Sequence, residues 1–231
     1  MRKKKVTTRI FLGGGGSSEK SVEFDREFIK CFDTSKTMVY IPNAMEPKRH
    51  ESCLLWFKSV MGSLGVMRIA MWNKLKPEAP IHEIGGIYMG GGDTGRLLLQ
   101  LRESGFSRYL KSAFANGVPI YGGSAGAIVL GTDIRTTPEA ADFDGRSARG
   151  LALLPKHSVS CHYDGDGEKL IQMSKRLGKP VLGIPETAGV VVESHRLRVV
   201  SDPVALATGT KLRALTPGDS PRPPEYSLGW R

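Results

Sequence analysis

Cysteine is scarce in this sequence. Cys31, Cys53 and Cys161 are its three cysteines among 231 residues, and no two of them form a CxxC pair. An odd, scattered set of this kind predicts neither a disulfide framework nor a zinc knuckle, and it is typical of a reducing compartment. A chain of this length can bury a sizeable core without such cross-links.

Long apolar runs are lacking too. The basic start "MRKKK" is followed by an apolar stretch of only about "RIFL" before four glycines, which is shorter than the apolar region of a signal peptide. No run reaches the length needed to span a membrane. We therefore expect a cytoplasmic protein without a membrane partner.

Acidic residues are outnumbered, with 23 Asp and Glu against 33 Lys and Arg, for a formal net charge of +10. Such an excess can attract nucleic acid. Apart from "RKKK", however, the basic residues are dispersed, and no nucleic-acid-binding signature accompanies them. We expect no nucleic-acid partner, and the sequence leaves a monomer and a homodimer open.

Short apolar runs alternate with longer amphipathic segments. Strands are expected at 7–14, 36–44, 66–72, 83–92, 118–123, 153–163 and 180–186, with a hairpin at 188–201. Helices are expected at 18–32, 49–65, 94–117 with a bend near Gly105, from Ser124, and at 167–178. The alternation predicts an α/β fold of three layers, a mostly parallel sheet with helices on both faces. We expect one domain over residues 1–231, with an irregular Pro-rich tail from about 216.

Two glycine-rich loops follow expected strands, where sites of such sheets lie. "GGGGSSEKS" is a near miss to a P-loop, because Glu19 stands where the motif needs a glycine before its lysine. We interpret it as a flexible turn, capped by Ser17 or Ser18 at the next helix. "GGGDTG" matches G-x-G-x-x-G, but the next strand ends without the acidic residue of a dinucleotide site. Its N–H groups could instead face a developing oxyanion.

The stretch "YGGSAGA" places Ser124 between small residues where a strand becomes a helix. It fits G-x-S-x-G, the nucleophile elbow, in which small neighbours relieve crowding at a strained turn. The other interpretation is a packing turn in which nothing larger fits. The position directly after a buried strand favours catalysis, with the N–H of Ala125 as one oxyanion donor.

A serine nucleophile needs a base. His162 ends an apolar run, so a strand would deliver it to the active edge, whereas His157 lies at the start of the same strand. His195 falls in the expected hairpin turn, and His50 and His82 are expected on the solvated surface. We favour His162.

The base needs an acidic residue to orient it. Glu186 follows "VLGIP" at the end of a later strand, and Glu139, in the loop after "IRTT", is its competitor.

Four motifs in order, "GGGDT", "YGGSAGA" with "DIRTT", "LLPKHSVSCHYD" and "VLGIPETAGVVVE", resemble those of peptidase family S51, the group of dipeptidase E (aspartyl dipeptidase) and cyanophycinase. The resemblance runs from about residue 9 to residue 209. It implies a flavodoxin-like fold similar to class I glutamine amidotransferases, with serine in place of their cysteine. It also implies a serine peptidase acting on short peptides, with no metal or cofactor.

Carried over by position, the resemblance implies Ser124 as nucleophile and His162 as base. Glu186 is the third member, although Glu139 aligns near an aspartate sometimes given that role. Gly92 and Ala125 supply the oxyanion N–H groups.

The sequence departs from dipeptidase E at several points. Asp93 stands in place of an asparagine and Gly123 in place of a tryptophan. The segment after the expected base is shorter, and only Lys169 is near the position of the arginine thought to bind the substrate's aspartate. Asp93, Arg135 and Lys169 are therefore candidate substrate-binding residues. The carboxylates beside Lys169 disfavour an acidic first substrate residue, unless Arg135 or another distant cation reaches the site.

Overall fold

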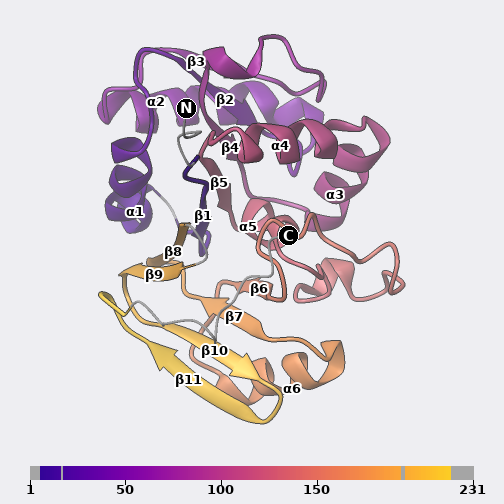
Figure 1. The fold of residues 1–231 in the computed structure, drawn as a ribbon. Coiled ribbons are helices and arrows are strands. Elements are labelled where there is room, and N and C mark those ends of the chain that lie inside the picture. Colours follow the sequence, from indigo (N-terminus) through magenta and orange to yellow (C-terminus); the bar gives the residue numbers. More distant parts are fainter. Residues whose placement is uncertain (1–5, 17, 194–195, 220–231) are drawn as a thin grey trace, which may run out of the picture.

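A seven-stranded sheet forms the centre of the computed structural model, which describes residues 6–16, 18–193 and 196–219 (Figure 1). The strand order is β3-β2-β4-β5-β1-β8-β9. The first five strands in this order are parallel to one another, whereas β8 is antiparallel to β1 and β9 is antiparallel to β8. The bounds are β1 Arg9–Gly13, β2 Thr37–Ile41, β3 Ile69–Met71, β4 Ile84–Met89, β5 Ile120–Gly123, β8 Ala188–Glu193 and β9 Arg196–Ser201. The parallel strands end at one edge, which is where the suspected loops begin.

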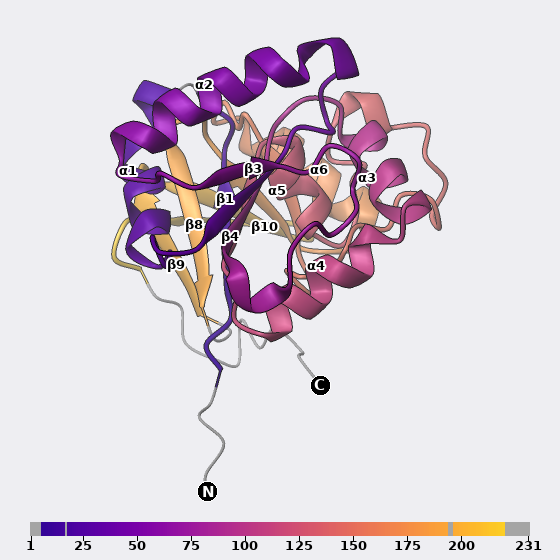
Figure 2. The ribbon, with the colours of Figure 1, turned by 90° about the horizontal axis from the view of Figure 1, so that it is seen from above.

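Helices cover both faces of this sheet, as the alternating pattern predicted (Figure 2). One face is covered by α1 and α2, and the other by α3, α4 and α5. The bounds are α1 Ser18–Lys30, α2 His50–Ser63, α3 Thr94–Glu103, α4 Phe106–Ala115 and α5 Ala125–Leu130, with short 3₁₀ helices at Pro47–Arg49, Ile81–Glu83 and Pro138–Ala140. The expected break lies at Gly105, between α3 and α4.

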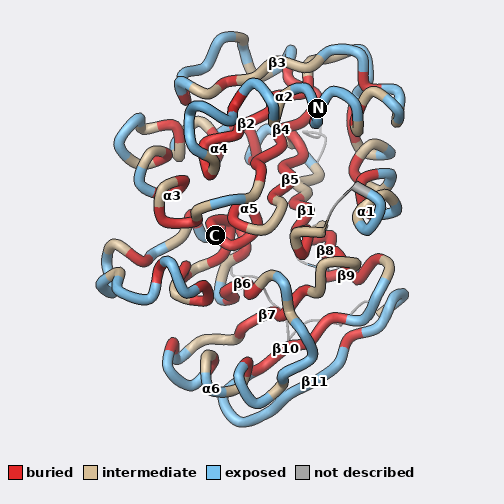
Figure 3. Tube along the Cα trace, turned by 180° about the vertical axis from the view of Figure 1, so that it is seen from behind, coloured by how far each residue is buried: buried red, intermediate tan, exposed pale blue. Residues whose placement is uncertain are grey.

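Alternate residues of the strands point to opposite faces, so each helical layer meets its own apolar surface. Phe11 of β1 packs with Phe24 and Phe28 of α1, whereas its neighbours Ile10 and Leu12 belong to the core on the other face. The strands β1, β2, β4, β5 and β8 are accordingly buried almost throughout, whereas the edge strands β3 and β9 are more exposed (Figure 3). The three-layer α/β fold expected from the sequence is therefore confirmed.

A second sheet of four strands lies beside the first, in the order β11-β10-β7-β6 (Figure 1). Its bounds are β6 Ser158–Cys161, β7 Val181–Ile184, β10 Val204–Thr208 and β11 Lys211–Leu215, and it packs against α6 Gly167–Leu177. The strands expected at 153–163 and 180–186 thus form, but outside the main sheet. The β10–β11 hairpin has no counterpart in the sequence prediction, because β11 is exposed along most of its length and lacks an apolar run.

The described residues end in a turn at 216–219, where Asp219 accepts the N–H of Thr216 at 2.7 Å. The rest of the Pro-rich tail lies outside the described residues, and a single domain over 1–231 stays a prediction. None of the helices in the described ranges is long and apolar enough to cross a membrane.

A buried carboxylate lies on α1 beside Tyr121 of the sheet. Asp25 is 1% exposed and accepts a hydrogen bond from Ser21 Oγ at 2.9 Å. Burial raises the pKa of this carboxyl to about 6, and the hydroxyls of Ser21 and Tyr121 oppose only part of the rise. Its Oδ1 atom has no hydrogen-bond partner among the described residues. The ionised form is therefore poorly supported at neutral pH.

We expect Asp25→Asn to stabilise the fold at pH 7.5. The pKa of Asp25 is raised from 3.8 to about 6, so its favourable contribution is complete below about pH 4 and is lost as the pH rises through 6. The gain at pH 7.5 should be about 2 kcal/mol and should shrink towards pH 4, measured by urea unfolding across this range. Asp33→Asn is the control. Ser35 lowers the pKa of that exposed carboxyl, so its removal should act in the opposite direction. Equal stability of Asp25→Asn and wild type at pH 4 and 7.5 would contradict the interpretation.

Candidate active site

Ser124 lies at a sharp turn between β5 and α5. Its backbone has φ 49° and ψ −113°, a conformation that side-chain-bearing residues rarely adopt. Its N–H donates to the carbonyl of Gly13 at 3.1 Å, and its own carbonyl accepts from Ala127 at 2.8 Å. The strand-to-helix elbow predicted from "YGGSAGA" is therefore present, with its strained backbone fixed on both sides.

His162 and Glu186 follow the paired parallel strands β6 and β7, whose last residues, Cys161 and Ile184, are in register. Both side chains consequently reach the same edge. His162 Nε2 lies 2.8 Å from Ser124 Oγ, and His162 Nδ1 lies 2.9 Å from Glu186 Oε1. The structure brings together the three residues that the sequence singled out.

Ser124, His162 and Glu186 form a hydrogen-bonded row, and the charge on Glu186 determines which atoms of the row carry protons. Lys20, whose Nζ lies 2.6 Å from Glu186 Oε2, and then His162 hold the pKa of the Glu186 carboxyl below its usual range. An ionised carboxylate only accepts, so Nδ1 must carry the proton. In the neutral ring, Nε2 is then left to accept the hydrogen bond from the hydroxyl of Ser124.

The glycine loop after β1 packs directly against this row. Gly15 has φ 104°, and a Cβ there would lie 2.6 Å from His162 Cε1 and 2.9 Å from the Cβ of Ser124. The N–H of His162 donates to the carbonyl of Gly14 at 3.0 Å. The loop interpreted from sequence as a flexible turn is therefore a packed part of the site.

Glu139 lies elsewhere in the site. It belongs to the 3₁₀ helix Pro138–Ala140, and Thr94 Oγ1 donates to its Oε1 at 3.5 Å. No hydrogen bond joins it to His162 within the described ranges. The geometry therefore favours Glu186 over Glu139 as the partner of the histidine.

A cavity of about 860 Å³ opens beside Ser124. Its charged lining residues are Arg135, Glu139, Asp164, Asp166, Lys169 and Arg176. Of the residues proposed from sequence for substrate binding, Arg135 and Lys169 line it. Asp93 instead caps α3 by accepting the N–H of Arg96 at 2.8 Å, and it lines a separate, more open hollow.

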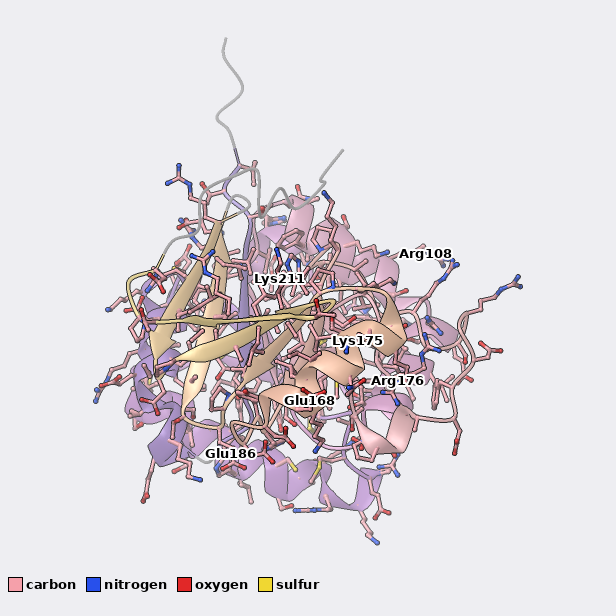
Figure 4. The ribbon with its side chains drawn as sticks, turned by 90° about the horizontal axis from the view of Figure 1, so that it is seen from below. Arg108, Glu168, Lys175, Arg176, Glu186 and Lys211 are labelled. Atoms are coloured by element: carbon pink, nitrogen blue, oxygen red, sulfur yellow. The ribbon has the colours of Figure 1, made fainter. Side chains whose placement is uncertain are left out.

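Arg176 is the cavity cation that the sequence interpretation missed. It lies near the C-terminal end of α6, with Glu168 near the start of the helix (Figure 4). One Nη of Arg176 donates to the carbonyl of Arg135 at 2.6 Å, while the guanidinium of Arg135 is paired with Asp133. The sequence did contain a signal for Arg176: it follows Lys169 by seven residues, which places both cations on one face of the helix.

Of the two residues proposed for the oxyanion, Gly92 lines the cavity, and Ala125 directly follows a residue that lines it. That residue is Ser124, and Ala125 is the first residue of α5. The first N–H groups of a helix have no intrahelical acceptors, so they are available to a ligand. Cys161 also lines the cavity, but burial raises the pKa of its thiol to about 12, so it does not compete as a nucleophile.

Three of the remaining histidines lie in the described residues, and none of these three lines the cavity beside Ser124. His157 is buried before β6, and His82 is exposed as expected. The surface position expected for His50 is wrong: it is 6% exposed, because it opens α2 against Met45, whose carbonyl lies 3.2 Å from its Nε2. His195 lies outside the described residues. No group of three or more His, Cys, Asp or Glu side chains suited to a metal occurs in the described part of the chain.

The model of peptidase family S51 matches residues 10–200. The chain belongs to this family. Membership makes it a serine peptidase. Among curated relatives, Peptidase E of Shewanella denitrificans is 27% identical over 188 residues, covering 76% of this chain and 80% of the relative. Peptidase E of Streptomyces coelicolor is 26% identical over 170 residues, covering 69% of each chain.

Two solved structures resemble this S51 chain in fold. A peptidase from an acI-B1 Actinobacterium has a TM-score of 0.75 at 21% identity, covering 92% of this chain and 96% of its own. A putative Peptidase E protein from Listeria monocytogenes has a TM-score of 0.64 at 19% identity, covering 84% and 98%. Both likenesses support the flavodoxin-like fold, similar to class I glutamine amidotransferases.

We expect Glu186→Gln to lower turnover more than Glu139→Gln does. The first change removes the negative charge 2.9 Å from His162 Nδ1, whereas the second acts on a group that contacts Thr94. A loss of about 10²-fold or more is expected for the first and less than about tenfold for the second, measured as kcat on one substrate. The reverse ranking would assign the third role to Glu139.

Proposed function

We propose that this S51 peptidase hydrolyses short peptides by a Ser-His-Glu mechanism of the dipeptidase E type. The observation that carries the proposal is the continuous row Ser124 Oγ, His162 Nε2 and Nδ1, and Glu186 Oε1, with gaps of 2.8 and 2.9 Å. A nucleophile within reach of a base, which is itself oriented by a third group, is the arrangement that acyl transfer requires.

In this mechanism Ser124 Oγ attacks the peptide carbonyl while Nε2 of His162 takes the hydroxyl proton. Glu186 stabilises the imidazolium that forms. The N–H groups of Gly92 and Ala125 bind the oxyanion of the tetrahedral intermediate. The imidazolium then protonates the departing amine, leaving an acyl-serine that water hydrolyses with His162 again as the base.

The cavity supports a small substrate. Its volume of about 860 Å³ lies in the range of sites for small molecules, so it suits a short peptide better than a folded chain. The alternatives are another hydrolase of the same fold, either cyanophycinase-like or ester-cleaving, and a ligand-binding module without catalysis.

A fluorophosphonate probe tests catalytic competence, because it labels an activated serine covalently. We expect labelling of the wild type and none of Ser124→Ala, which should also lose at least ~10³-fold in peptidase rate. Ser160→Ala removes a second serine that lines the cavity and should keep the label. Unchanged melting temperatures would exclude unfolding as the cause. An unlabelled wild type would favour the binding module, and a wild-type rate in Ser124→Ala would remove this serine from the mechanism.

A dipeptide panel tests the first substrate residue. The sequence argument against an acidic residue required that no distant cation reach the site, but Arg135 and Arg176 both line the cavity. Because these and Lys169 face three carboxylates, we expect Asp-Leu, Ala-Leu and Lys-Leu to agree within about tenfold in kcat/KM at fixed ionic strength, or about 1.4 kcal/mol. A preference of ~10²-fold or more for Asp-Leu would contradict charge balance. Replacing Arg135, Lys169 and Arg176 in turn would then identify the cation responsible.

A further inference from the structure

We propose that Lys20 is a positioning residue of the catalytic row, which holds Glu186 in place and limits how strongly its carboxylate favours the imidazolium of His162. The inference rests on the proposed function and adds to it a fourth residue. Lys20 belongs to "GGGGSSEKS", the near miss to a P-loop whose lysine was left without a role by the sequence interpretation.

The two oxygens of Glu186 have different partners. Oε1 faces His162 Nδ1 at 2.9 Å, and Oε2 faces Lys20 Nζ at 2.6 Å. The side chains of Glu186 and Lys20 are 40% and 50% exposed, so packing alone does not fix the carboxylate. A second charge-assisted hydrogen bond restricts its rotation and keeps Oε1 directed at the imidazole.

The fold places Lys20 at this point from the opposite end of the sequence. It lies in the first turn of α1, directly after the glycine loop, and it is 166 residues from Glu186. A Cβ on Gly16 would lie 2.4 Å from the carbonyl oxygen of Glu186 and 2.8 Å from Lys20 Cβ, so the lysine approaches across a position without a side chain. Phe24 and Phe28 bury the next turns of the helix against the sheet. The packed backbone of the loop and of α1 therefore determines how Lys20 approaches Glu186.

Such a half-exposed ion pair contributes little to folding, because water and salt screen it. Its effect on the catalytic row is direct, because Lys20 and His162 contact the same carboxylate, that of Glu186. Without the ammonium, the full negative charge acts on His162 and favours the protonated ring. The base would then become available only at higher pH, and the freed carboxylate would orient the ring less well.

Other charges near the pair have their own contacts. On α1, Glu23 accepts from Ser201, and beyond Glu186 the hydroxyl of Thr187 donates to Asp202. After His162, Asp164 accepts a backbone N–H of its own turn, as does Asp166 at the start of α6. Glu19 adjoins Lys20 on α1. All of these remain when Lys20 is replaced, so a change in pH dependence would come from the Lys20–Glu186 pair.

The test measures the rate of serine labelling by a fluorophosphonate between pH 5 and 9 in Lys20→Met, Lys20→Arg and Lys30→Met. Lys30 is the matched control, because it lies on the same helix and pairs with Glu27 away from the site. For Lys20→Met we expect the acid limb to move up by about half a pH unit and the plateau rate to fall about fivefold. Lys20→Arg should restore most of both, and Lys30→Met should match the wild type.

A wild-type profile in Lys20→Met, or the same change in Lys30→Met, would overturn the proposal. Titration of the His162 ring by NMR in the same variants needs no turnover. If the wild type is not labelled, the proposed function fails, and the ring titration still decides the role of Lys20. A midpoint at higher pH in Lys20→Met supports it, and an unchanged midpoint overturns it.

Discussion

Two backbone hydrogen bonds, one to the last residue of β1 and one to the loop that follows it, hold the candidate nucleophile and base in place. The carbonyl of Gly13 accepts the N–H of Ser124 at 3.1 Å, and the carbonyl of Gly14 accepts the N–H of His162 at 3.0 Å. Because Ser124 follows the central sheet and His162 follows the second sheet, this loop joins the two sheets at the site. Both residues have positive φ, 49° and 54°, a strain of about 1–3 kcal/mol each that only well-fixed surroundings sustain.

The same loop decides where α1 begins, and so extends its influence to the acidic residue. Its last glycine leads into a helix whose first turn contacts Glu186 through Lys20 and whose second turn contains the buried Asp25. The candidate nucleophile and base are thus each held by a backbone hydrogen bond to this segment, whereas the carboxylate of Glu186 is held by its contacts with His162 and Lys20. This difference makes the carboxylate the part of the row that depends most on a neighbouring charge.

The sequence predicted the layers of the fold and the three side chains of the row, because apolar periodicity and strand ends are local signals. It did not predict that β6 and β7 form a second sheet, since strand pairing depends on contacts far apart in the chain. The glycine loop was interpreted as a flexible turn because the residues that crowd it, Ser124 and His162, lie about 110 and 150 positions further along the chain. Arg176 was missed because its role depends on which face of α6 meets the cavity.

The row and the cavity charges are controlled by separate parts of the fold. Leu170 and Leu177 pack α6 against the second sheet, while Lys169 and Arg176 extend towards the cavity from the same helix. Substitution of Lys169 or Arg176 would leave the small core under α6 intact, and it would not alter the loops that hold Ser124 and His162. Long, exposed cations on a helix face can therefore change without cost to the catalytic geometry. If the proposed function holds, substrate preference would vary through α6, whereas the chemistry would be constrained by the glycine loop.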